Sequence, residues 1–264
     1  MQELISTSNA PILQVKELVK QFGGNRAVDH ATFDVANQSI TGLIGPNGAG
    51  KTTCFNCIAG ALSPNDGNVI FDEHNITGLP PYRIFDHALI RTFQIPQELS
   101  QMSVLENLML ARGGQDGERL WEAWIHPKKI ATQESELQKS AMEILDLVDL
   151  SQHAHQTASS LSGGQRKLLE LARALMGQPR MILLDEPSAG VNPTLARKLS
   201  EHIEMIRNKL EITFLLISHD MDIIERLCDK VIVMTGGHVL IEGTPDEVFS
   251  NIEVQEAYLG SQYR

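Results

Sequence analysis

The sequence predicts an α/β fold with a mostly parallel sheet, an N-terminal antiparallel β subdomain and an inserted α-helical subdomain. Short apolar segments at residues 40–44, 181–184 and 212–217 alternate with segments of helical periodicity, which is typical of buried parallel strands joined by helices. Before all three apolar segments, residues 12–15 and 28–35 alternate between apolar and polar side chains. That period of two indicates strands with one buried face.

The composition narrows the possible classes of protein. With 264 residues the chain can bury a large core, and its three cysteines predict no disulfide framework. Its 33 acidic residues outnumber its 22 basic ones, and the net charge of −11 disfavours general binding to nucleic acid or to an anionic membrane. No apolar run approaches the ~20 residues that span a bilayer, and no signal peptide is visible at the start. We therefore expect a cytoplasmic protein that meets a membrane through a partner.

The middle of the chain predicts the helical subdomain, over about residues 96–165. Ser103 and, three residues later, Glu106 form the pattern of a capping box, which opens a helix. Residues 134–150 again have helical periodicity, whereas residues 113–133 are polar and irregular apart from two tryptophans.

The last third returns to alternating strands and helices. Residues 194–210 predict an amphipathic helix and residues 221–227 a short one. Residues 231–234 and 238–241 flank Gly236-Gly237, which predicts a hairpin. We thus expect a single domain whose α/β core covers about residues 11–95 and 166–250, with the helical subdomain at 96–165 and a C-terminal tail at 251–264.

A glycine-rich loop after the strand at residues 40–44 is the strongest functional motif. Gly45-Pro46-Asn47-Gly48-Ala49-Gly50-Lys51-Thr52 fits the pattern GxxxxGK[ST] in full. Glycines let backbone N–H groups curl around phosphate oxygens, and the helix that follows points its positive end at them. We expect Lys51 to reach the β- and γ-phosphates and Thr52 to bind Mg²⁺, with Thr53 beside them. In the same helix, Cys54 and Cys57 are expected to be buried packing residues.

Two adjacent carboxylates complete the expected magnesium site. Asp185 and Glu186 follow the apolar strand at residues 181–184. A carboxylate at a strand end beside a phosphate loop is suited to bind Mg²⁺, so we assign Asp185 to the metal. Glu186 must point differently and can face an attacking water, as a general base does. No other metal site is expected among the histidines.

A second glycine-containing helix start lies before the acidic strand. Leu161-Ser162-Gly163-Gly164-Gln165 opens a helix predicted to run to about Gly177. Such a terminus suits an anion. Alone the motif is weak evidence, because Ser-Gly-Gly also occurs in linkers and caps. It becomes informative together with the glycine loop and the acidic strand end.

In this order the motifs resemble those of the ATP-binding cassette (ABC) ATPases, over nearly the whole chain. Residues 161–165 match the LSGGQ signature of that family. Gln94 resembles the Q-loop glutamine, residues 188–192 the D-loop and His219 the switch histidine. Phe22 stands where the family places an aromatic ring against adenine. The resemblance implies a P-loop ATPase core that binds ATP and Mg²⁺.

The resemblance also implies partners. In this family two cassettes dimerise head to tail, with ATP between the P-loop of one and the signature of the other. One motif of each kind occurs here, so a second ABC ATPase subunit and transmembrane permease subunits are implied, on the inner face of the cell membrane. Gln94 would touch Mg²⁺ or water, and His219 would contact the γ-phosphate. The signature residues implied to meet the partner's ATP are Ser162, Gly163, Gly164 and Gln165.

The subfamily rests on finer resemblances. The Gly-Gly after Phe22, the context Arg91-Thr92-Phe93-Gln94 and the ending at residues 254–260 resemble ATPases of importers of branched-chain and hydrophobic amino acids, which implies an indirect partner, a solute-binding protein. Urea importers and the lipopolysaccharide-export ATPase are similar. A soluble iron–sulfur assembly ATPase is the rival outside transport. A regulatory module without hydrolysis is disfavoured by the intact acidic and histidine motifs.

Several residues keep a plainer interpretation beside the functional one. Phe22 could be ordinary packing, and Gln94 could be a surface amide. The tryptophans Trp121 and Trp124 could meet a membrane subunit or could simply pack on a surface excursion. Asn192 departs from the aspartate that many cassettes carry in the D-loop, which leaves its contact across a dimer open.

Overall fold

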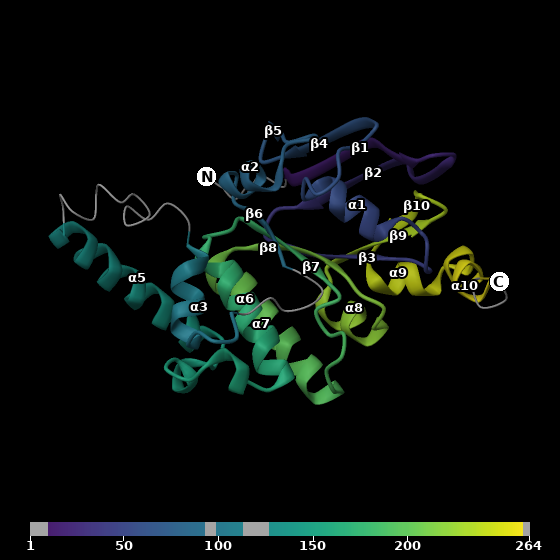
Figure 1. The fold of residues 1–264 in the computed structure, drawn as a ribbon. Helices are drawn as coiled ribbons and strands as arrows, with labels where there is room; N and C mark the ends of the chain where they lie inside the picture. The colour runs from purple at the N-terminus through teal and green to yellow at the C-terminus, as the bar shows by residue number, and fades with distance from the viewer. Residues whose placement is uncertain (1–9, 93–98, 113–126, 261–264) are drawn as a thin grey trace, which may run out of the picture. The chain divides into compact units, whose positions relative to one another are not determined.

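The computed structural model describes residues 10–92, 99–112 and 127–260 and divides the chain into two compact units. The first comprises Met1–Arg91, Arg180–Pro187 and Glu204–Arg264, and the second comprises Thr92–Pro179 and Ser188–Ile203. Figure 1 shows the elements of both. The predicted Gln94 and the Trp121–Trp124 segment lie outside the described residues. No helix in the described ranges is both long enough and apolar enough to cross a bilayer.

The first unit contains a six-stranded sheet with the strand order β10-β9-β3-β8-β7-β6. Its strands are β3 (Ile40–Ile44), β6 (Leu89–Arg91), β7 (Met181–Asp185), β8 (Thr213–Ile217), β9 (Lys230–Thr235) and β10 (His238–Gly243). All pairs are parallel except β9 with β10, which form the predicted hairpin. Every residue of β3, β7 and β8 is buried, which explains their continuous apolar sequence.

A second sheet in this unit is antiparallel, as the alternation predicted, and has the order β2-β1-β4-β5. It is built from β1 (Pro11–Phe22), β2 (Asn25–Ala36), β4 (Asp66–Phe71) and β5 (His74–Asn75). The strands β1 and β2 are longer than the predicted segments because register shifts let the pairing continue through irregular positions.

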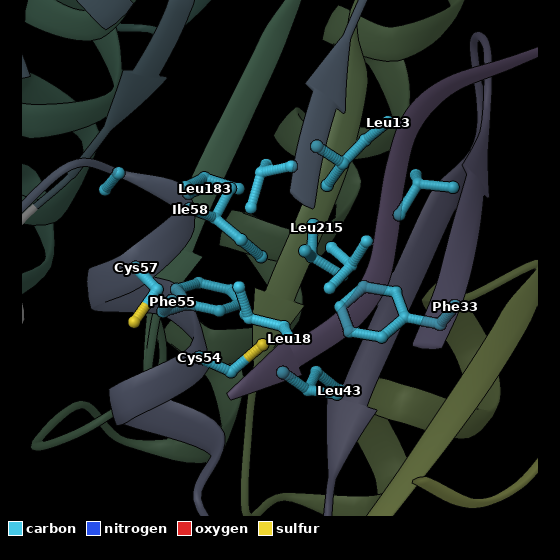
Figure 2. Packing of buried hydrophobic residues seen from close by; sticks show 14 of the residues in the cluster. Leu13, Leu18, Phe33, Leu43, Cys54, Phe55, Cys57, Ile58, Leu183 and Leu215 are labelled. Carbon is cyan, nitrogen blue, oxygen red and sulfur yellow. The ribbon is translucent and has the colours of Figure 1, made fainter. Parts of the chain in front are cut away.

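Helices complete the first unit, namely α1 (Lys51–Ile58), α2 (Pro81–Asp86), α8 (Met221–Leu227), α9 (Pro245–Ser250) and α10 (Ile252–Gly260). One core joins α1 to strands of both sheets. Figure 2 shows Phe55 and Ile58 of α1 in that core with Leu18 of β1 and Leu215 of β8. Cys54 and Cys57 are free and buried there, as predicted, and burial raises the pKa of the Cys57 thiol to about 11.

The second unit is helical. It contains α3 (Val104–Ala111), α5 (Pro127–Leu147), α6 (Gly163–Met176), two short 3₁₀ turns (Ser151–His153 and Ala158–Ser160) and the part of α7 (Pro193–Leu210) that ends at Ile203. Ser103 and Glu106 form the predicted capping box. The prediction that residues 113–133 are irregular is wrong for residues 127–133, which already belong to α5. The sequence of residues 127–133, PKKIATQ, has too few apolar residues to show a helical period.

We expect Phe55→Ala to lower the free energy of unfolding by about 3–5 kcal/mol, because the ring is fully buried and its loss leaves a cavity among both sheets and α1. Equilibrium unfolding in urea measures the change. The matched control is Phe85→Ala in α2, where the residue is 37% exposed and the loss should stay below about 1 kcal/mol. Equal losses at the two positions would contradict this view of the core.

Candidate functional site

Three parallel strands bring the predicted residues of the first unit to one edge of its sheet. Strand β8 lies between β3 and β7. In this register Leu43 pairs with Ile217, and Ile217 pairs with Asp185, so the three carboxyl ends are level. The glycine loop and Glu186 directly follow the ends of β3 and β7, and His219 follows the end of β8 after Ser218. A level edge of this kind is where α/β sheets bind their ligands.

The glycine loop at residues 45–50 takes a path that side chains would block. Gly45 has φ 147°, and a Cβ there would lie 2.1 Å from the carbonyl oxygen of Met234. Gly50 has φ 99°, and its Cβ would lie 2.2 Å from the carbonyl oxygen of Ala27. Helix α1 then begins at Lys51 with no side-chain cap. Its first backbone N–H groups are therefore available to an anion such as a phosphate.

The Lys51 side chain folds back along this loop. Its ammonium group donates to the carbonyl oxygens of Gly45, at 2.7 Å, and Pro46, at 3.0 Å. Burial lowers the pKa of Lys51, and the nearby carboxylates of Glu186 and Asp185 partly offset that effect. An ammonium has three N–H donors, so a ligand oxygen can add to these two carbonyls. The arrangement holds a cation at the loop before any ligand arrives.

The adjacent carboxylates face different partners, as the sequence predicted. Asp185 is 5% exposed, and its Oδ2 accepts a hydrogen bond of 2.8 Å from Arg91. Glu186 has φ 50°, a left-handed conformation that costs a residue with a side chain roughly 1–2 kcal/mol. Its backbone N–H donates to the carbonyl oxygen of Ile217. This turn directs the Glu186 carboxylate toward the end of β8.

Glu186 and His219 are in direct contact, which the sequence did not predict. Glu186 Oε1 lies 3.2 Å from His219 Nε2, and Glu186 Oε2 accepts from the His219 backbone N–H at 3.3 Å. Burial raises the pKa of Glu186, while His219 opposes the shift through its charge and its N–H group. The Glu186 carboxyl therefore holds a proton more readily than an exposed glutamate does. The signal in the sequence was that each residue follows the end of a neighbouring strand.

The other predicted residues of the first unit lie as follows. Thr52 is exposed, and Thr53 is half-buried at the start of α1. Phe22 is 50% exposed, with Lys20 Nζ 5.2 Å from its ring centroid, so the ring is not a core residue. Its plainer interpretation as core packing is therefore wrong, whereas loop packing and the predicted contact with adenine both stay predictions.

Oxygen ligands suited to Mg²⁺ are present at the sheet edge. The described residues contain no group of three or more His, Cys, Asp or Glu side chains that could hold a metal alone. Mg²⁺ usually binds through one or two protein oxygens together with substrate phosphates and water. The Asp185 carboxylate and the exposed Thr52 hydroxyl fit that pattern, so the site suits Mg²⁺ only together with a nucleotide.

The signature residues of the second unit form a capped helix start. Ser162 Oγ accepts from the Gln165 backbone N–H at 3.4 Å, and Gln165 Oε1 accepts from the Ser162 N–H at 2.9 Å. A Cβ on Gly163 would meet open space, whereas one on Gly164 would overlap Leu195 of α7 at 1.7 Å. Gly163 thus leaves its backbone accessible, and Gly164 allows close helix packing.

Three further contacts escaped the sequence interpretation. The Gln165 amide nitrogen lies 2.9 Å from Nε2 of His153. Asn192 Oδ1 accepts from the Leu195 N–H, so an asparagine caps α7 where aspartate was expected. Arg91 had been noted only as part of a motif, and it binds Asp185. Two of these contacts join residues that are far apart in the sequence, and the third is a local helix cap. A pattern read along the sequence does not show which residues meet.

Comparison with known proteins adds independent findings. The family model described as ABC transporter matches residues 28–189, and the model described as Branched-chain amino acid ATP-binding cassette transporter matches residues 238–264. The probable branched-chain amino acid transport ATP-binding protein LivG of Archaeoglobus fulgidus is 40% identical over 255 residues, which cover 95% of this chain and 96% of that protein. High-affinity branched-chain amino acid transport ATP-binding protein LivG of Escherichia coli is 38% identical over 250 residues, 95% and 98% of the two chains. The crystal structure of the ADP conformation of an ATP-binding cassette of an ABC transporter has a TM-score of 0.81 and 37% identity, covering 95% of this chain and 99% of that one.

We expect Glu186→Gln to raise the free energy of unfolding at neutral pH. A carboxyl whose pKa is raised by folding binds its proton more tightly in the folded state. Its ionised form therefore lowers stability above the raised pKa, and the amide removes that effect. The advantage of the variant should shrink as the pH falls through the raised pKa.

Urea unfolding between pH 5 and pH 8 measures this difference. The matched control is Glu225→Gln, because Glu225 is exposed on α8. A Glu186→Gln advantage that is absent at neutral pH, or that grows on acidification, would contradict the burial of the charge.

Proposed function

Because this chain belongs to the ABC transporter family as an ATP-binding cassette, we propose that it hydrolyses ATP to drive the uptake of branched-chain amino acids through partner membrane subunits. One observation carries the proposal. The glycine loop, Asp185 and the Glu186–His219 pair lie together at the carboxyl ends of neighbouring parallel strands. The amino-acid substrate is supported by the names of the relatives and by the match of the C-terminal segment.

The loop and α1 would bind the triphosphate. The uncapped N–H groups at the start of α1 and the Lys51 ammonium supply positive charge where the β- and γ-phosphates would lie. Phe22 offers an exposed aromatic face for adenine. Thr52 and Asp185 would hold Mg²⁺, which neutralises phosphate charge when it is bound.

Glu186 would act as the general base and His219 would position it. The base must accept a proton from water near neutral pH, and a raised pKa makes its carboxylate a stronger base. His219 contacts the same carboxylate through its ring and through its backbone, which limits where the carboxylate can point. Gln94 is proposed to contact Mg²⁺ or water on the resemblance alone.

The proposal includes a second cassette and permease subunits. Ser162, Gly163 and Gly164 would meet ATP held by the other cassette, since the chain carries one loop and one signature. The accessible backbone of Gly163 supports that role. Gln165 would support it through the capping box. The chain would then work at the inner face of the membrane, with a solute-binding protein delivering the substrate to the permease.

We expect Glu186→Gln to keep ATP binding and to lower the rate of hydrolysis by at least ~10²-fold, as loss of a general base should. ATP binding is measured by calorimetry and hydrolysis by phosphate release. Glu225→Gln serves again as the control and should hydrolyse ATP normally. Near-normal turnover in Glu186→Gln would refute the assignment of the base.

The transport role is tested by purifying the chain from its native membranes in mild detergent and identifying the proteins that accompany it. We expect multi-span permeases and a second cassette, because one loop and one signature cannot form the sandwich within one chain. A solute-binding protein of that system should bind leucine, isoleucine or valine. Binding of urea instead would refute the amino-acid substrate, and soluble partners alone, under conditions that preserve a control transporter, would refute transport.

A further inference from the structure

Arg91 joins the two parts of the proposed nucleotide site. It is the last residue of β6, at the edge of the six-stranded sheet next to β7. One guanidinium nitrogen donates to Asp185 Oδ2 at 2.8 Å, and the other donates to Oδ1 of Asn56. Asn56 lies on α1, the helix that begins at Lys51. A single side chain therefore links the phosphate-binding helix to the carboxylate proposed to hold Mg²⁺.

The Arg91–Asp185 pair is shielded from water. The Arg91 side chain is 19% exposed and that of Asp185 is 6% exposed. A buried carboxylate needs a cation or several donors, because water no longer stabilises its charge. Among the described residues, the hydrogen bonds given to the Asp185 carboxylate come from Arg91. Arg91 is thus the cation that is hydrogen-bonded to Asp185, while the Lys51 ammonium interacts with it through charge alone.

We propose that Arg91 is a positioning residue that acts as the counter-cation of Asp185 when no Mg²⁺ is bound, and that Mg²⁺ competes with it for the same carboxylate. The inference rests on the proposed function, which makes Asp185 a magnesium ligand. Two cations at one carboxylate repel each other, so each weakens the hold of the other. By reciprocity, metal binding must loosen the Arg91 contact as much as Arg91 weakens metal binding.

Removing the Arg91 charge should lower the stability of the metal-free protein and raise its affinity for metal. These opposite effects distinguish the proposed role from a merely structural one. Without metal, removing the Arg91 charge takes away the cation that is hydrogen-bonded to the buried Asp185, so the protein should be less stable. With metal, the same removal ends the competition, so the metal should bind more tightly. Loss of a residue that only stabilises the fold would lower both the stability and the metal affinity.

The test compares Arg91→Gln with the wild type using Mn²⁺ and ADP as the probe. Electron paramagnetic resonance of Mn²⁺ gives the metal affinity of the ADP-loaded protein, and urea unfolding in EDTA gives the metal-free stability. We expect Arg91→Gln to unfold at lower urea and to bind Mn²⁺ several-fold to about ten-fold more tightly. Arg91→Lys keeps the charge and should restore an affinity near that of the wild type. Asn56→Ala, the matched control, removes one hydrogen bond without a change in charge and should leave Mn²⁺ affinity within about two-fold.

A measurement on the unaltered protein keeps the inference testable if Arg91→Gln fails to fold. With ¹⁵N-labelled arginine, the guanidinium signal of Arg91, identified by its loss in Arg91→Lys, should shift and exchange faster with water when Mg²⁺ joins ADP. An unchanged signal, or an unchanged or weaker Mn²⁺ affinity in Arg91→Gln, would overturn the inference alone. Failure of the wild type to bind Mn²⁺ with ADP would overturn the magnesium role in the proposed function as well.

Discussion

The parallel pairing of β3, β8 and β7 is the constraint on which the candidate site depends. Ile217 at the end of β8 pairs with Leu43 on one side and with Asp185 on the other, so three loops leave the sheet at one level. Every residue of the three strands is buried, so a slip by one residue would move each side chain out of the packing site that fits it. The level edge, in turn, decides which side chains can meet a common ligand.

Charged side chains are concentrated at this edge, where the proposed ligand would bind. Lys51 is buried against loop carbonyls and Asp185 against Arg91, and the half-buried Glu186 contacts the exposed His219. Glu186 also carries a left-handed backbone. Desolvated charges and an unfavourable backbone lower stability, and such local costs are typical of functional sites. By the proposed function, phosphates and a metal ion would supply charges opposite to those of these side chains.

The two helix starts with glycines use different chemistry. Helix α1 follows Gly50 in a left-handed conformation and has no side-chain cap, which leaves its N–H groups to an anion. Helix α6 follows Ser162, whose hydroxyl oxygen accepts from the Gln165 N–H in a capping box. The hydroxyl proton of Ser162 can still be donated, so this start can give one hydrogen bond without losing its cap. The start of α1 therefore leaves several N–H groups for the proposed phosphate, whereas the start of α6 offers one hydroxyl donor.

The sequence by itself determined the fold class, the order of the strands along the chain, the glycine loop and the pair of residues 185–186. These features depend on local chemistry, namely glycine at positive φ, apolar runs in buried strands, and the capping box, in which a serine stands three residues before a glutamate or glutamine. Most predicted strands and helices were confirmed. The early start of α5 was missed because residues 127–133 have too few apolar residues to show a helical period.

Tertiary structure alone decided which residues meet. The contacts Arg91 with Asp185, Glu186 with His219 and His153 with Gln165 join segments 94, 33 and 12 residues apart. No local pattern encodes such distances, because strand order in the sheet is set by packing and not by position in the chain. The sequence thus supplied the chemical groups, and the order of the parallel strands, together with loop and helix packing, placed them in contact.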